Sequence, residues 1–191
     1  MWTRTSAAVA RATVVIAVLM SLVGCQEGGS VVSEKHAGGS ATLNEQRSWA
    51  IGEIDAVIDV TGTQGMWRGT ASTAPRWETL VENILDNSRK VRCAFEMGKP
   101  NPAALKVDLW SDPLNEDPFE LAERVRELWT AAGWEVADII RKGDTETERV
   151  YFRADRADGA EMSLEASDAS MRKSLTLSVQ AACSSDPSVA W

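Results

Sequence analysis

The chain has 191 residues, enough for one domain with a real core, and its formal net charge is −8. Residues 1–24 contain Arg4 and Arg11 but no acid, so the rest of the chain holds 18 basic against 28 acidic residues, a charge of −10. So acidic a domain lacks the basic surface that nucleic acid requires, and an anionic membrane surface repels it. Any tie to a membrane must therefore be apolar or covalent.

The N-terminus has the features of an export signal. Arg4 and Arg11 are followed by thirteen uncharged residues, from Ala12 to Gly24. A helix needs about 20 apolar residues to cross a bilayer, so this run is too short to span one. Its length is typical of the apolar core of a signal peptide.

The apolar run ends in Leu22-Val23-Gly24-Cys25, which resembles the lipobox of bacterial lipoproteins. The resemblance implies cleavage before Cys25 and attachment of diacylglycerol to the Cys25 sulfur. Two acyl chains anchor a protein stably, whereas one holds it only marginally. We therefore expect lipid on Cys25 to hold the mature chain at the cell membrane, on its extracytoplasmic face.

Residues 25–41 are rich in Gly, Ser and charge, which predicts a flexible tether. The single histidine of the chain, His36, lies in it and is expected to be solvated. We expect four segments in all. They are a signal peptide over 1–24, the lipidated tether over 25–41, one folded domain over 42–185 and a short tail over 186–191.

Two helices are predicted next. Thr42 and Glu45 have the spacing of a capping box, and the apolar positions behind them predict a helix over 43–61 that ends at Gly62. A second helix is expected from Pro75 to Asn87. The glycine-rich stretch between the two helices predicts a loop or a short irregular strand.

The apolar period then changes to two. Residues 91–97 and 105–109 alternate, and turn residues separate them, so we predict a hairpin with one buried face. Asp117 and Pro118 have the chemistry of an N-cap and of a first helical position, which predicts a helix that ends at Gly133.

Four strands are expected after this helix. The first follows Trp134, and the others cover 150–155, 161–166 and 174–182. Strands that cluster after helices indicate an α+β domain, with helices packed on one face of an antiparallel sheet of about five to six strands.

Three cysteines occur, and an odd number in an exported protein indicates one thiol with a separate role. With Cys25 acylated, Cys93 and Cys183 remain to pair in an oxidising compartment. Alternation places Cys93 with Val91 and Cys183 with Val179, so both are expected to point toward the core. In the chain-entropy model a closed loop of this length stabilises by ~4–5 kcal/mol at most.

No histidine exists outside the tether, so Ser-His or Cys-His catalysis and zinc held by His and Cys are excluded. Glycine motifs for nucleotides are also absent. We therefore expect no catalytic residue, no cofactor and no metal. The oxygen-rich segment 112–117 could bind calcium, but it lacks EF-hand spacing and is more simply a solvated loop with an N-cap.

Tryptophan is abundant, with eight residues against one tyrosine. Trp77 and Trp129 fit helix faces and are expected in the core. Trp67, Arg68 and Trp110 are harder to bury by pattern, and exposed Trp and Arg are typical of binding surfaces. The alternative is that these tryptophans cover a sheet face or pack under the loop.

In layout the chain resembles the small single-domain cell-surface lipoproteins of actinobacteria, and the specific part of the likeness is the lipobox. We expect a non-enzymatic module that binds an envelope protein or ligand, and not nucleic acid. One alternative is a hydrolase of envelope glycans or lipids, which needs two carboxylates about 5–10 Å apart in a cleft. Another is a lipid carrier, which needs an apolar interior cavity.

Overall fold

The computed structural model describes residues 39–70, 74–83, 88–93, 101–143, 148–169 and 172–190. The predicted signal peptide, Cys25 and His36 lie outside the described residues, as do 84–87 of the second predicted helix and 94–97 of the first predicted hairpin strand. Within the described part, no helix has both the length and the apolar character to cross a membrane.

The centre of the fold is a seven-stranded antiparallel sheet, with strand order β1-β3-β7-β6-β5-β4 and β2 also paired to β3. Its strands are β1 (Trp67–Gly69), β2 (Arg89–Arg92), β3 (Ala103–Ser111), β4 (Glu135–Ile140), β5 (Arg149–Asp155), β6 (Glu161–Ala169) and β7 (Arg172–Gln180). Strand β3 and the meander from β4 to β7 confirm those strand predictions. β2 covers 89–92 where 91–97 was predicted, and its side chains are exposed or half-buried, so the predicted buried face is not found in this strand. The sheet has seven strands where five to six were expected. The glycine-rich stretch forms the short strand β1.

Two of the three predicted helices begin where their N-caps predict, whereas the second begins at Trp77 rather than at Pro75. In α1 (Leu43–Thr61) the Thr42 amide donates to the Glu45 carboxylate at 2.8 Å, and Gly62 adopts the left-handed conformation, with φ 66°. In α4 (Pro118–Ala131) the Asp117 carboxylate accepts from the Phe119 amide at 2.8 Å. The second predicted helix is short: α2 (Trp77–Leu80) continues into one 3₁₀ turn, η2 (Val81–Asn83).

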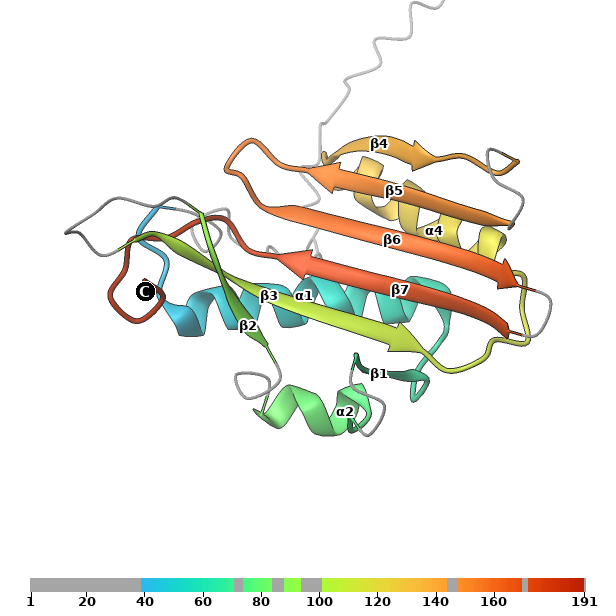
Figure 1. Cartoon of the computed structure of the whole chain (residues 1–191), viewed down its shortest axis with the longest axis horizontal. Helices are drawn as coiled ribbons and strands as arrows, with labels where there is room; N and C mark the ends of the chain where they lie inside the picture. The colour runs from blue at the N-terminus through green and yellow to red at the C-terminus, as the bar shows by residue number, and fades with distance from the viewer. Residues whose placement is uncertain are drawn as a thin grey trace, which may run out of the picture.

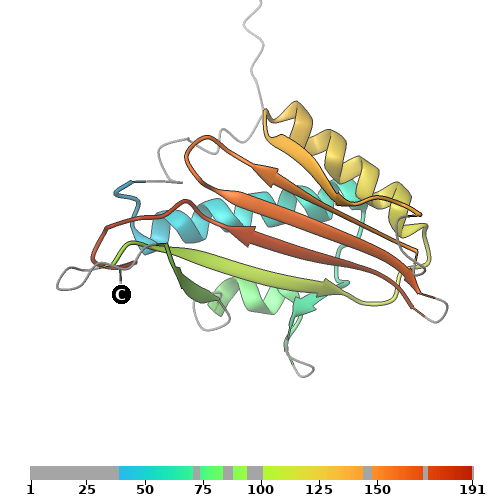
Figure 2. The ribbon, with the colours of Figure 1, turned by 45° about the horizontal axis from the view of Figure 1, so that its top comes forward.

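The molecule has two layers. Figure 1 looks onto the bare face of the sheet, with α1 and α4 behind it, and Figure 2 shows the same two helices on the same side. Large apolar side chains of the strands face these helices and are buried: Leu105, Val107, Leu109, Phe152, Met162, Leu164, Leu175, Leu177 and Val179. The predicted α+β fold, with helices on one face of an antiparallel sheet, is confirmed.

The disulfide of Cys93 with Cys183 is present, with an S–S distance of 2.06 Å across 90 residues of sequence. Its predicted place in the core is wrong, because Cys93 is exposed and Cys183 is half-buried. Both cysteines lie beyond the ends of their strands, since β2 ends at Arg92 and β7 ends at Gln180. Strand alternation therefore does not decide where these two side chains point.

The folded domain extends beyond the predicted boundaries at both ends. The Gly39 amide donates to the Cys183 carbonyl at 3.1 Å, and the Ser185 amide donates to the Gly39 carbonyl at 3.1 Å. Ala41 and Val189 are buried, with 2% and 0% of their surface exposed. Residues 39–41 of the predicted tether and most of the predicted tail thus belong to the domain.

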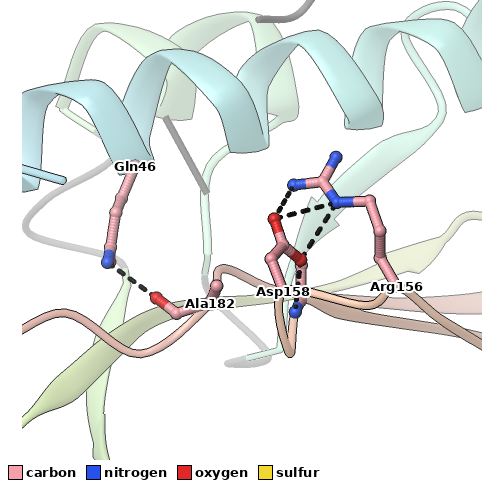
Figure 3. Close-up of polar contacts among 5 residues, drawn as sticks. Gln46, Arg156, Asp158 and Ala182 are labelled. Atoms are coloured by element: carbon pink, nitrogen blue, oxygen red, sulfur yellow. Dashed lines mark hydrogen bonds and ion pairs between the residues drawn. The ribbon is translucent and has the colours of Figure 1, made fainter. Parts of the chain in front are cut away.

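Gln46 of α1 is a buried polar side chain that completes the sheet (Figure 3). Its amide nitrogen donates to the Ala182 carbonyl at 2.9 Å, and its amide oxygen accepts from the Leu105 amide at 2.8 Å. Both backbone groups lie where the ladder between β3 and the segment after β7 shifts register. The side chain therefore provides partners that the neighbouring strand does not.

Candidate functional site

Trp67 is not part of a binding surface, contrary to the prediction. It has 0% of its surface exposed, and its indole N–H donates to the Thr63 hydroxyl at 2.7 Å. The Thr63 hydroxyl is in turn within 2.7 Å of the Thr61 hydroxyl at the end of α1. Trp67 thus holds β1 against the helical layer. This agrees with the alternative prediction that it packs under the loop.

Trp110 lies on the bare face of the sheet and has 46% of its surface exposed. Arg68 stands directly beside it, because Arg68 and Trp110 are partners in the register of β1 with β3. The next residue across the sheet is Thr176 of β7, which is the partner of Trp110 on its other side. Two of the three residues predicted as a binding surface, Arg68 and Trp110, therefore come together.

The backbone pairing of β3 with β7 ends at Trp110. The hydroxyl of Ser111 accepts from the Leu175 amide at 2.8 Å, in the place of a backbone carbonyl. The Asp112 amide turns away toward β1 and donates to the Met66 carbonyl at 2.7 Å. The chain meets β7 again only where the Leu114 amide donates to the Lys173 carbonyl at 3.0 Å.

A hollow of about 180 Å³ lies where these strands diverge, open to solvent. We refer to it as the Trp110 hollow, and its lining residues are Trp110, Ser111, Arg172, Ser174, Leu175 and Thr176. No carboxylate is among them. Because drug-sized ligands occupy about 300–1,000 Å³, this hollow has room for one small group or one ring of a larger ligand.

The charges near the hollow are mainly positive. Arg68 and Arg76 both form ion pairs with Asp112, so two guanidinium groups share one carboxylate. Arg172 is exposed, and it forms no ion pair with any residue that the structure describes. The hollow therefore has local positive charge on a chain whose net charge is −8.

The acidic segment 112–117 has structural partners in the described structure. Asp112 is held by the two arginines, and Asp117 caps α4. Leu114, between them, is buried with 7% of its surface exposed. Across the described ranges, no group of three or more His, Cys, Asp or Glu side chains is arranged to hold a metal ion.

A second, larger hollow of about 410 Å³ lies between α1 and α2, and we refer to it as the acidic hollow. Asp55, Asp59 and Glu78 contribute carboxylates to its wall. Each carboxylate already accepts a hydrogen bond from the protein: Asp55 from the Trp77 indole at 2.7 Å, Asp59 from Gln64 at 3.2 Å and Glu78 from the Gly65 amide at 2.8 Å. These bonds join α2 and the β1 loop to α1.

A third cluster of charged and aromatic side chains holds the turn between β5 and β6, and Figure 3 shows its Arg156–Asp158 pair. The Arg156 guanidinium lies 5.4 Å from the Trp49 ring centre and 4.9 Å from that of Trp134, and it donates to Asp158 at 2.8 and 3.1 Å. Burial opposes the charge of Asp158, but the hydrogen bonds from Arg156 and from the Ala160 amide outweigh it and lower its pKa. The charges are matched within the cluster, so its role is structural.

Glu53 lies close to this cluster on α1. Burial raises the pKa of Glu53 above its ordinary value, although the positive charge of Arg156 partly offsets the effect. A carboxyl group of this kind loses stabilising free energy when it ionises. Glu53 therefore belongs with the structural cluster around Arg156.

Comparison with protein-family models, with curated proteins and with solved structures finds no match to this chain. The site is therefore defined by its geometry. Arg172, Ser174 and Thr176 were missed from the sequence. In the sequence, the alternation of β7 shows only that these three residues share one face of the strand. The pairing of β3 with β7 shows that this face is the one that carries Trp110.

Proposed function

We propose that this protein is a lipid-anchored module of the extracytoplasmic membrane face that binds an envelope partner or ligand without chemical turnover. The observation that carries the proposal is the exposure of Trp110 beside a hollow on the bare face of the sheet. Large exposed aromatic side chains are enriched where proteins bind their partners. The lipobox resemblance at Leu22-Val23-Gly24-Cys25 supplies the proposed location.

The two alternative functions have less support. Among the described residues, the lining of the Trp110 hollow holds no carboxylate, so these residues offer no acid pair for hydrolysis. The carboxylates of the acidic hollow accept hydrogen bonds that hold α1, α2 and the loop before β1 together. A lipid carrier would need an enclosed apolar cavity, whereas these two hollows are open and partly polar.

Site-specific photocrosslinking in intact cells tests the binding function. A benzophenone amino acid at position 110 should yield a discrete adduct, because its side chain occupies the proposed contact surface. The same amino acid at Ile139 is the matched control, since Ile139 is equally exposed, at 50%, but lies on β4 at the far edge of the sheet. A second probe at Arg68, the register partner of Trp110, leaves the indole in place. No adduct at either of these positions, or the same adducts there and at Ile139, would refute the proposed surface.

Metabolic labelling tests the anchor separately. The wild-type chain should incorporate radioactive palmitate, and Cys25→Ala should abolish the label. Cys93→Ala is the control, because Cys93 is engaged in the disulfide and should not affect labelling. Labelling that persists in Cys25→Ala would contradict the lipid anchor.

A further inference from the structure

We propose that the Trp110 hollow binds one ring of an acidic saccharide, with the sugar face against Trp110 and its carboxylate paired with Arg172. This inference rests on the proposed binding function and names its ligand class. The carrying observation is the combination of an exposed indole, two hydroxyl side chains and an arginine without an ion pair among the described residues, all around one small hollow.

The indole is free to stack. No aromatic ring and no cation among the described residues covers Trp110, and 46% of its surface is open. The C–H groups on one face of a pyranose ring are weakly positive, and the face of an indole is negative. The volume of about 180 Å³ beside it suits one ring rather than a long ligand.

The polar residues match the rest of such a ring. Ser174 and Thr176 lie on the face of β7 that carries Trp110's partner, and a hydroxyl group both donates and accepts. A sugar hydroxyl also donates and accepts, so it can form both kinds of hydrogen bond with these two side chains. Ser and Thr carry no charge, so a charged group of the ligand would have to pair with another residue.

Arg172 is the residue that would pair with the carboxylate of the ligand. A guanidinium binds a carboxylate through two parallel hydrogen bonds, which gives both strength and orientation. The nearest acid along the register row, Glu165, lies beyond Thr176 and pairs with Arg149 at 3.6 Å. The carboxylate of the ligand should therefore point toward Arg172 and away from β6.

Other occupants fit less well. An extended peptide binds by adding a strand to a free sheet edge, but where β7 leaves β3 its Leu175 amide already donates to Ser111 and its Lys173 carbonyl already accepts from the Leu114 amide. A nucleic acid or an anionic membrane would meet the net negative charge of the chain. A single acidic ring contacts only the indole and one arginine, so it meets the local positive charge rather than the net negative charge of the whole chain.

Isothermal titration of the purified full chain with defined saccharides tests the inference. The probes are trigalacturonate, a hyaluronate tetrasaccharide and 3′-sialyllactose, each beside its methyl ester, which keeps the rings and removes the charge. At least one acid probe should bind, and its ester should bind about tenfold more weakly or not at all. Raising the salt concentration should weaken the acid probe alone.

Variants then locate the binding. Trp110→Ala and Arg172→Gln should each weaken binding of the acid probe about tenfold or more, whereas Ile139→Ala should not change it. Thermal melting of each variant shows that the fold is intact. The inference is overturned if no acid probe binds, if acid and ester bind alike, or if both site variants bind as the wild type does. If crosslinking at position 110 succeeds while every saccharide fails, the ligand class is wrong and the binding function stands.

Discussion

Trp67 and Trp110 lie one register position apart on the paired strands β1 and β3, yet they occupy opposite faces of the sheet. Trp67 is paired with Ser111 and is completely buried, whereas Trp110 is paired with Arg68 and is 46% exposed. Neighbouring pairs in a sheet point to alternate faces, so one position separates a core residue from a surface residue.

The two tryptophans should therefore respond oppositely to truncation. Trp67→Ala should lower the free energy of unfolding by about 3–5 kcal/mol, because it leaves a cavity and removes the partner of Thr63. Trp110→Ala should change it by less than about 1 kcal/mol. Urea denaturation followed by circular dichroism measures both, and equal losses would contradict the assigned faces.

Gln46 should be required for stability although it is polar. Gln46→Met keeps the length of the side chain but leaves the Leu105 amide and the Ala182 carbonyl without their partner. Each of the two unsatisfied buried groups costs about 1–3 kcal/mol, so we expect a total loss of about 2–6 kcal/mol. Gln64→Met, at an exposed position, is the control and should cost less than about 0.5 kcal/mol.

Glu53 should make stability depend on pH in a defined direction. Because the folded-state pKa of Glu53 is raised above its ordinary 4.5, its contribution is present below that pH and is lost as the pH rises through the folded-state value. Glu53→Gln cannot ionise. Its free energy of unfolding relative to the wild type should therefore increase between about pH 4 and neutral pH, measured by urea titration at each pH. A difference that stays constant, or falls, would contradict the raised pKa.

Loss of the disulfide should weaken the fold. Replacing both Cys93 and Cys183 with Ser should lower the free energy of unfolding by about 2–5 kcal/mol, because the unfolded chain gains freedom. The wild type in reducing agent should behave like this variant. Titration of unfolded, unreduced Cys25→Ala should find no free thiol, and two free thiols would show that the bond does not form.

Local patterns predicted the regular elements well. The caps of α1 and α4 are chemical signals within a few residues, and the strands from β5 to β7 are long enough for alternation to appear. The exposure of Trp110 also followed from its opposite alternation to Leu109. In these segments local sequence and tertiary packing agree.

The remaining features depend on contacts between distant segments. β1 has three residues, too few to show a period, and Trp67 is buried because that strand pairs with β3. Gly69 allows a close approach there, since a Cβ at this position would lie 3.0 Å from the Cβ of Ala74 and would push the two segments apart by a few tenths of an ångström. The Trp110 hollow arises because Ser111 ends the pairing with β7, and no local pattern marks that hydroxyl.

The hydrogen bonds of Gly39 also determine how the domain would bear a pulling force. Tension in the chain ahead of Gly39 would reach first the amide and carbonyl bonds to Cys183 and Ser185, before the first turn of α1. Cys183 is covalently joined to Cys93, at the end of the hairpin of β2 and β3. The load would therefore pass into the sheet through this crosslink and through the two backbone bonds of Ser184 with Ala103, before it reached α1. When force is applied at the N-terminus of the domain, the first bonds to bear it would therefore be those to its C-terminal segment.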